Sequence, residues 1–333
     1  MKKVNNLKIA VIGCGYWGTV IVLTLFKLGI KNIIVFDNYK ENLKTIKKRF
    51  SKVFIKESLK DIINDKDISG VVICTPASTH FKIAKKFIEK GINLFIEKPV
   101  CLNPLEVQKL QKLSSKKKIF IMSGYVYNYN VYINYIKNII KKKELGKIRY
   151  ISIERSNLGP IRNDASSIWD LGSHDISSSL YILESLPIKI EANGYDFLKK
   201  DIYDISFLRL IFPNNVLVNI QSNWLNPEKV RKLIIVGSKK MLLFDELNKK
   251  SPIKIYNKYA EYPKLKTFKN DFFSTKANIY KGKTITPVIK YRPSMELELE
   301  HFCQCLIKNK KPNTDINYAL KVSKIIERIK YLK

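Results

Sequence analysis

Short apolar runs and amphipathic segments alternate through the first third of the chain. Mostly apolar runs of four to six residues occupy positions 7–12, 32–36, 52–55, 70–74, 92–96 and 118–122. Segments with apolar residues at helical spacing lie between most of them, at 19–28, 39–50, 59–63, 80–90 and 104–113. Buried strands that alternate with helices are typical of α/β proteins, so this part predicts a doubly wound (Rossmann) parallel sheet with helices on both faces.

The pattern changes after residue 123. One strand, at 147–155, lies between helical segments at 131–145 and 169–186. Serial strands without intervening helices follow, at 188–195, 202–212, 216–224, 229–237 and 241–246. Such a series predicts a large, mostly antiparallel open sheet. Residues 248–292 give no firm assignment, and two helices, at 293–308 and 316–332, end the chain.

With 333 residues, the chain is long enough for two domains with sizeable cores. We expect a Rossmann domain at 1–123 and an α+β domain at 124–333, whose last helices pack back on the first domain. No run approaches the ~18–20 apolar residues that a membrane span needs, and no signal peptide follows the basic N-terminus. We therefore expect a cytoplasmic protein without a membrane partner. The five cysteines show neither a paired framework nor zinc spacing, which predicts reduced thiols and no metal.

The formal charge of +32 raises the question of nucleic-acid binding. The lysines are spread along the whole chain, mixed with asparagine and isoleucine, and form no single block or stripe. This spread indicates a bias of composition more than a binding surface, so nucleic acid is a weak alternative. A smaller anion, such as a nucleotide or a sugar phosphate, would benefit from the same field.

A glycine-rich loop directly follows the first strand. Gly13 permits a tight turn, Gly15 lets the backbone approach a pyrophosphate, and Gly18 lets the next helix pack on its strand. Asp37, nineteen residues after Gly18, ends the second strand and would bind the adenosine ribose. The absence of a neighbouring arginine favours NAD, although residues 38–40 leave NADP open. The expected cofactor contacts in this loop are Gly13, Gly15, Tyr16, Trp17 and Gly18.

Polar residues follow two further strands at the point where each ends. The fourth apolar run leads into Thr75, Pro76 and His80, and the fifth stops at Glu97-Lys98-Pro99. Open α/β sheets bind ligands at the carboxyl ends of their strands, so we expect these residues at the cofactor. Taken alone, Lys98 is more often a solvated strand end, and His80 is more often structural. A cis bond before Pro99 would aim the lysine inward.

A second set of candidates lies on the helical segment at 169–186. Asp170 and His174 are four residues apart and stack on one helical face, whereas Asp175 need not share it. A carboxylate so placed fixes or polarises an imidazole, which can then take a proton near neutral pH. A histidine on a helix is more often structural, but the neighbouring Trp169 and Asp170 favour function.

In their order and spacing, these motifs resemble the Gfo/Idh/MocA oxidoreductases over nearly the whole chain. Besides the glycine loop, the resemblance rests on Thr75-Pro76-x3-His80, Glu97-Lys98-Pro99, Glu144-Leu-Gly-Lys-Ile148, Trp169-Asp170-x3-His174-Asp175 and Glu300-x-Phe302…Pro312-x-Thr314-Asp315. The segment Gly159-Pro160-Ile161-Arg162-Asn163-Asp164 is similar to the branch that acts on nucleotide-linked sugars. Its members oxidise the 3-hydroxyl of UDP-N-acetylglucosamine-type sugars or reduce a keto-sugar.

The resemblance implies a role for each candidate residue. Lys98 would bind the reacting oxygen and the nicotinamide ribose, and His174 would take the hydroxyl proton as hydride leaves for NAD(P). Asp170 would orient the site, with Lys98 facing His174 across a cleft. Glu97 is a further expected cofactor contact. The expected substrate contacts are His174, Tyr129, Asn130, Arg155, Asn157 and Arg162, because guanidinium groups suit a diphosphate.

Two departures and two alternatives qualify this interpretation. Many members have Gly-His before a Tyr-Asn-Pro element, where this chain has Gly124-Tyr125 and Tyr129-Asn130-Val131. The shape of the substrate pocket is thus open. A dehydrogenase of free polyols such as inositol is the alternative enzyme, and a non-catalytic nucleotide-binding regulator is the alternative of another class. An open sheet face predicts a homodimer or homotetramer in either case.

Overall fold

The computed structural model describes residues 4–162, 165–262 and 277–329. The chain divides into two compact units. One holds Met1–Asn130 with Arg292–Glu327, and the other holds Val131–Tyr291 with Arg328–Lys333. The first unit thus extends past the boundary expected at residue 123. Asn163 and Asp164 of the proline-containing motif lie outside the described residues, as does the end of the helix expected to reach 332.

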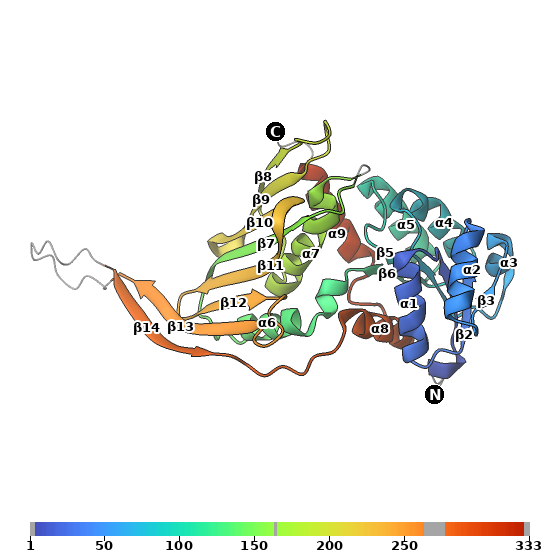
Figure 1. Cartoon of the computed structure of the whole chain (residues 1–333), viewed down its shortest axis with the longest axis horizontal. Helices are drawn as coiled ribbons and strands as arrows, with labels where there is room; N and C mark the ends of the chain where they lie inside the picture. The colour runs from blue at the N-terminus through green and yellow to red at the C-terminus, as the bar shows by residue number, and fades with distance from the viewer. Residues whose placement is uncertain (1–3, 163–164, 263–276, 330–333) are drawn as a thin grey trace, which may run out of the picture. The chain divides into compact units, whose positions relative to one another are not determined.

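A six-stranded parallel sheet forms the centre of the first unit (Figure 1). Its order is β3-β2-β1-β4-β5-β6. The strands are β1 (Lys8–Ile12), β2 (Asn32–Phe36), β3 (Phe54–Ile55), β4 (Gly70–Ile73), β5 (Leu94–Glu97) and β6 (Ile121–Gly124). All of β4 is buried, as a strand covered on both faces must be. The predicted doubly wound parallel sheet is confirmed.

Helices connect these strands: α1 (Tyr16–Lys27), α2 (Lys40–Arg49), α3 (Leu59–Asn64), α4 (Ala77–Glu89) and α5 (Pro104–Lys116). The Ser58 hydroxyl caps α3 by accepting the N–H of Lys60, and Asn103 caps α5 in the same way. Helices α1 and α4 begin earlier than the apolar spacing predicted. Their first turns carry exposed or partly exposed residues such as Tyr16, so no buried stripe marks them.

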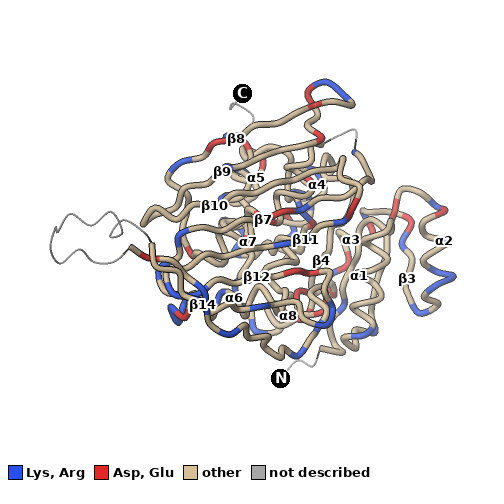
Figure 2. Tube along the Cα trace, turned by 60° about the vertical axis from the view of Figure 1, so that its left-hand side comes forward, with Lys and Arg blue, Asp and Glu red and all other residues tan. Residues whose placement is uncertain are grey.

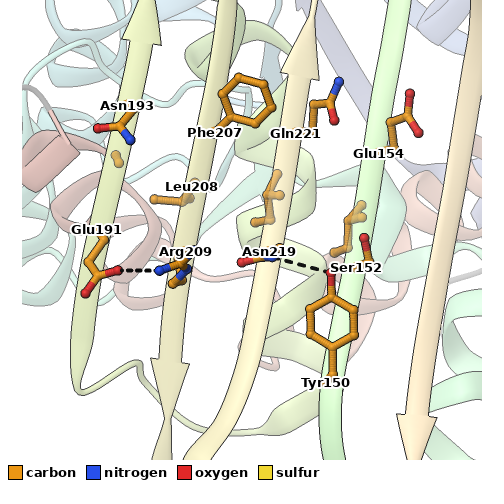
Figure 3. Close-up of a pocket in the computed structure, with 13 residues that line it drawn as sticks. Tyr150, Ser152, Glu154, Glu191, Asn193, Phe207, Leu208, Arg209, Asn219 and Gln221 are labelled. Carbon is orange, nitrogen blue, oxygen red and sulfur yellow. Dashed lines mark hydrogen bonds and ion pairs between the residues drawn. The ribbon is translucent and has the colours of Figure 1, made fainter.

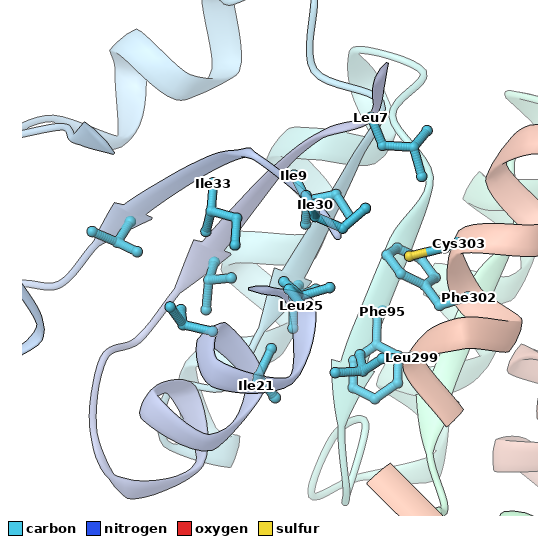
Figure 4. Packing of buried hydrophobic residues seen from close by; sticks show 14 of the residues in the cluster. Leu7, Ile9, Ile21, Leu25, Ile30, Ile33, Phe95, Leu299, Phe302 and Cys303 are labelled. Carbon is cyan, nitrogen blue, oxygen red and sulfur yellow. The ribbon is translucent and has the colours of Figure 1, made fainter. Parts of the chain in front are cut away.

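The C-terminal helices α8 (Ser294–Lys308) and α9 (Ile316–Ile329) group largely with the first unit. The Phe302 ring lies edge-on to the rings of Phe95 and Phe120, with centroids 5.7 and 6.1 Å apart. Figure 4 shows Phe302 beside Phe95 in the buried cluster. The Ser123 N–H donates to the Thr314 carbonyl over 2.7 Å and fixes the segment before α9 on β6. These contacts make α8 part of the core that supports the end of β5.

An eight-stranded sheet forms the second unit, in the order β14-β13-β12-β11-β7-β10-β9-β8 (Figure 1). Its strands are β7 (Ile148–Leu158), β8 (Lys189–Tyr195), β9 (Ile205–Phe212), β10 (Val216–Asn223), β11 (Leu225–Gly237), β12 (Met241–Asp245), β13 (Ile253–Glu261) and β14 (Asn278–Ile285). Neighbouring strands are antiparallel except for the parallel pair β7 and β10. The predicted large, mostly antiparallel sheet is confirmed.

The helices of the second unit are α6 (Val131–Lys141), the π-helical turn η3 (Ile168–Gly172) and α7 (Ser173–Leu183). The sequence predicted one continuous helix where η3 and α7 stand. It also gave no assignment for β13 and β14. Every residue of β14 is exposed, so this strand lacks the apolar alternation that marks a half-buried strand.

Basic residues lie on helices, strands and loops of both units (Figure 2). None of the helices described has an apolar run long enough to cross a membrane. Within the described ranges, no group of three or more His, Cys, Asp or Glu side chains is arranged to hold a metal ion. The positive charge therefore belongs to many elements of both units.

Candidate active site

The register of the parallel sheet brings three loops to one edge of the first unit. Ile12 of β1 pairs with Ile73 of β4, which pairs with Ile96 of β5. The residues that follow these three begin the glycine-rich loop, the Thr75 loop and the Glu97-Lys98-Pro99 loop. Parallel strands end on the same side of a sheet, so the expected cofactor residues gather there.

Contacts within the glycine-rich loop explain its glycines. Gly13 has φ 98°, and a Cβ on it would lie 2.8 Å from the carbonyl carbon of Cys74. A Cβ on Gly18 would lie 1.9 Å from the carbonyl oxygen of Gly13, so any side chain there would force α1 away from the loop. A Cβ on Gly15 would meet no atom within 4 Å. The loop is thus closely packed on the protein side and open at Gly15.

Asp37 ties this loop to the end of β2. Its Oδ2 accepts the N–H of Cys14 over 2.7 Å and the side-chain amide of Asn42 over 3.1 Å. Its Oδ1 accepts the N–H of Tyr39 over 2.8 Å. A carboxylate can accept about four hydrogen bonds, so Oδ1 keeps capacity for a further donor such as a ribose hydroxyl.

The residues present fit a dinucleotide. The open space at Gly15 lies at the start of α1, where backbone N–H groups without helical partners favour a pyrophosphate. Tyr16 and Trp17, in the first turn of α1, are 77% and 49% exposed and are not held in the core. Asp37 stands at the second strand, where such a fold binds the ribose.

Glu97 is the last residue of β5 and pairs with Gly124 of β6. Its Oε2 accepts the backbone N–H of Lys98 over 3.1 Å, and a Cβ on Gly124 would lie 2.9 Å from that oxygen. Burial raises the pKa of Glu97 to about 7, although the N–H and the charge of Lys98 oppose the shift. The Lys98–Pro99 bond is cis.

His80 supports two of these loops. The ring is 1% exposed, with Nδ1 3.0 Å from the Pro99 carbonyl oxygen and Nε2 2.8 Å from that of Thr75. Burial lowers the pKa of His80, and the backbone groups of Thr75, Pro99 and Val100 partly offset this effect. Because both ring nitrogens contact backbone, His80 joins the loop after β4 to the loop after β5. Its expected contact with the cofactor stays a prediction.

The π-helical turn η3 carries Trp169 and Asp170 and leads into the first turn of α7, where His174 lies. A π turn holds more residues than an α turn, so the simple four-residue stacking expected for Asp170 and His174 does not describe this segment. Both side chains are partly exposed. Arg162 Nη1 lies 4.0 Å from Asp170 Oδ1, so two of the expected residues meet here.

Arg155 and Asn157, two expected substrate contacts on β7, bind other protein groups. Arg155 forms a bidentate ion pair with Asp175 of α7, with N–O distances of 2.8 to 3.0 Å, and both side chains are buried. Asn157 binds the Gly159 carbonyl and the Arg231 guanidinium. Arg155 therefore fixes the residue directly after His174.

Sequence reasoning missed this pairing, although β7 contained the signal for it. Ile151, Ile153 and Arg155 alternate on one strand face, and all three are buried. An arginine in phase with two isoleucines indicates a buried cation, which requires an acidic partner. Two further expected substrate contacts, Tyr129 and Asn130 of the first unit, are also buried. The rings of Tyr129 and His301 pack together, with their centroids 5.5 Å apart.

Two family models match the chain. Residues 7–125 match a model described as "Oxidoreductase family, NAD-binding Rossmann fold", and residues 133–243 match a model of the Gfo/Idh/MocA C-terminal domain. Together the two matches cover more than half of the chain.

Curated relatives match at low identity. The UDP-N-acetylglucosamine 3-dehydrogenase of Acidithiobacillus ferrooxidans is 25% identical over 195 residues, which is 58% of this chain and 60% of that protein. The inositol 2-dehydrogenase of Rhizobium meliloti is 27% identical over 143 residues, 41% of this chain and 43% of its own. The chain thus spans only about half the length of the curated relatives it matches.

Solved structures share the fold over nearly their full length. The UDP-N-acetylglucosamine 3-dehydrogenase GnnA of Acidithiobacillus ferrooxidans superposes with a TM-score of 0.81 at 19% identity, covering 98% of this chain and 97% of that one. GenD2 from gentamicin A biosynthesis, in complex with NAD, gives 0.79 at 16% identity, covering 98% and 95%. At these low sequence identities, the similarity shows that the fold is shared.

The buried ion pair gives a stability prediction. We expect Arg155→Met to lower the free energy of unfolding by about 3–5 kcal/mol, because it leaves the Asp175 carboxylate buried without its partner. Urea unfolding followed by tryptophan fluorescence measures the change. Lys44→Met is the control: its ion pair with Glu41 lies on the exposed surface of α2, so its loss should cost about 1 kcal/mol or less. Equal effects of the two substitutions would contradict the assignment.

Proposed function

Because the chain belongs to the Gfo/Idh/MocA family of oxidoreductases, we propose that it is an NAD-dependent dehydrogenase of a sugar, with a nucleotide-linked sugar as substrate. The observation that carries the proposal is the edge of the parallel sheet, where the open loop at Gly15, the Asp37 carboxylate and Lys98 occur together. A dinucleotide held there would have its reactive end near the strand that carries the lysine.

We assign the acid–base chemistry to three residues. NAD, when bound, supplies the hydride acceptor. His174 takes the proton of the substrate hydroxyl, and the Lys98 ammonium stabilises the negative charge that develops on the same oxygen. Asp170 orients the histidine and the substrate.

The substrate class rests on three observations. Arg162, partly exposed next to Asp170, offers a guanidinium for a diphosphate. The net charge of +32 favours an anionic ligand. One relative and one structural neighbour are UDP-N-acetylglucosamine 3-dehydrogenases, so the 3-hydroxyl of such a sugar, destined for polysaccharide or lipid A synthesis, is the first candidate. The inositol 2-dehydrogenase relative keeps a free polyol as the second candidate.

We also propose that the open face of the large sheet packs against a second copy of the chain. Strand alternation points Ile151 and Ile153 into the core and Tyr150 and Ser152 to the other face. That face carries a hollow of about 670 Å³ with the exposed Phe207 at its lining (Figure 3). A dimer or tetramer formed on this face would cover it.

A substrate panel tests the main proposal. Purified protein with NAD or NADP and a set of UDP-sugars and free polyols should reduce the nicotinamide with a UDP-N-acetyl sugar, followed by absorbance. Reduction with inositol and with no nucleotide sugar would replace the main proposal by the polyol alternative. Cofactor binding without turnover of any substrate would favour the regulatory alternative.

Alanine substitutions test the proposed roles. Lys98→Ala and His174→Ala should each lower kcat by about 100-fold or more, since each removes a group that acts on the reacting oxygen. Titration with NADH, followed by its fluorescence, should show cofactor affinity changed by less than about threefold, because neither group holds the adenosine or pyrophosphate. Lys109→Ala, on the exposed face of α5, is the matched control. Turnover near the wild-type rate in both variants would refute the roles.

The sheet face gives a test of assembly. Phe207→Glu, which places a charge on the open face, should shift the protein to a smaller species in light scattering after size exclusion. Phe54→Glu, at a similarly exposed phenylalanine on β3 of the other unit, should not. If Phe207→Glu leaves the mass unchanged, the interface lies elsewhere.

A further inference from the structure

The side chain of Arg231, on β11, holds three oxygen atoms. Its Nη1 donates to the backbone carbonyls of Ser156 over 2.8 Å and of Val230 over 2.7 Å. Its Nη2 donates to the side-chain oxygen of Asn157. A guanidinium group carries five donors in a fixed planar fork, so one arginine can bind several acceptors at once. Arg231 therefore fastens the end of β7 to β11.

The pairing of the two strands is interrupted at the same place. The register shifts between Leu225 and Val230 of β11, whereas their partners on β7 are only two residues apart. Four residues of β11 thus lie opposite the single residue Asn157. A bulge of this kind disrupts the regular ladder of backbone hydrogen bonds. The guanidinium of Arg231 supplies donors at the point where that ladder stops.

Asn157 passes this constraint to the loop that follows β7. Arg231 has only donors, so the Asn157 atom that it contacts is the amide oxygen, which leaves the amide nitrogen for an acceptor. That nitrogen donates to the carbonyl of Gly159. The N–H of Gly159 donates to the carbonyl of Trp224 over 3.3 Å. Both backbone polar groups of Gly159 are thus held, one of them by way of Arg231.

Arg162 lies three residues after Gly159, so their Cα atoms are at most about 11 Å apart. The Arg162 side chain is 44% exposed, and its Nη1 lies 4.0 Å from Asp170 Oδ1. A side chain on so short a loop takes its position from the residue at which the loop is held. A shift at Gly159 would therefore move the Arg162 guanidinium away from Asp170.

The charges around Arg231 are balanced. Arg231 stands directly opposite Arg155 on the neighbouring strand. The guanidinium of Arg155 lies 2.8 Å from the Asp175 carboxylate and 4.0 Å from that of Glu246. Two arginines and two acids thus occupy this part of the sheet. The hydrogen bonds of Arg231, more than its charge, distinguish it there.

We propose that Arg231 is a positioning residue for Arg162: through Asn157 and Gly159 it holds the loop 159–162, so that Arg162 meets the diphosphate of a nucleotide-linked sugar. The inference deepens the proposed function and rests on the substrate class given there. Arg231 and Asn157 act on the loop and touch neither the substrate nor NAD. Asn157, expected from the sequence to contact the substrate, is then the link between β11 and the loop.

Hydrogen exchange tests the hold on the loop without any ligand. Mass spectrometry of the native protein follows the amides of residues 159–162. These should exchange about fivefold faster in Arg231→Met and in Asn157→Leu, as expected for the loss of about one hydrogen bond. The two variants break the same link at different residues, so either suffices if the other does not fold. Unchanged exchange in the variants overturns the proposal.

Arg149→Met is the matched control. Arg149 lies near the start of β7, and its Nη1 donates to the Ala260 carbonyl over 3.3 Å. Its substitution removes the same charge from the same sheet without touching the link to Gly159. Exchange of the loop should therefore stay at the wild-type rate, and UDP affinity should change by less than about twofold.

Binding of UDP tests whether the loop serves Arg162. Calorimetric titration should show that Arg162→Met weakens UDP binding about tenfold and Arg231→Met about fivefold. Because Arg231 acts through Arg162, the double variant should bind UDP no more weakly than Arg162→Met alone. Additive losses, about fiftyfold in the double variant, would show that Arg231 acts independently of Arg162 and refute the positioning role.

Arg231→Lys separates the contacts from the charge. Lysine keeps the positive charge and lacks the planar fork, so this variant should bind UDP as weakly as Arg231→Met. Kinetics gives an independent readout. In Arg231→Met the KM for the UDP-sugar should rise about fivefold, with kcat and the KM for NAD within about twofold. Wild-type UDP affinity in Arg231→Lys, or a fall in kcat with unchanged KM in Arg231→Met, refutes the proposal.

The exchange and binding experiments separate the possible failures. If the loop exchanges faster in the variants while the wild type binds no UDP, the hold of Arg231 on the loop stands and the proposed substrate class fails. If the wild type binds UDP while exchange and affinity are unchanged in Arg231→Met, the substrate class stands and the role of Arg231 fails.

Discussion

The common register of β1, β4 and β5 is the constraint on which the candidate cofactor site depends. Ile12, Ile73 and Ile96 pair across the three strands, so the three following loops begin side by side. Those loops are short and closely fitted. Gly13 and Gly18 touch backbone that no side chain could share, and His80 joins the Thr75 loop to Pro99. In a parallel sheet without this alignment, the same motifs would lie at different heights along the strand direction.

Each unit also buries charged or ionisable groups next to a proposed reactive residue. In the second unit the Arg155–Asp175 ion pair stands directly behind His174. In the first unit the Glu97 carboxylate accepts the backbone N–H of Lys98. Buried polar groups reduce stability unless they are paired, and these two contacts lie next to the residues to which we assign the acid–base chemistry. In both units, polar contacts thus lie next to the proposed reactive residues.

Sequence reasoning recovered the regular parts of the fold well. Apolar runs gave the strands of the first unit because most of those strands are buried on both faces, and alternation gave most strands of the second unit. Sequence reasoning missed the parts of helices and strands whose residues are not buried. Fully exposed β14 carries no apolar period, and the first turns of α1 and α4 face solvent. The π turn η3 was read as part of an α-helix.

The sequence by itself determined the glycine loop, Asp37, the Glu97-Lys98-Pro99 motif and the family, because these depend on residue type and local spacing. Tertiary structure alone decided the partners of buried groups. Arg155 and Asp175 are twenty residues apart, His80 and Pro99 are nineteen residues apart, and no local period joins either pair. Strand pairing and helix packing bring such residues together, and a buried charge takes its properties from whatever group the fold places beside it.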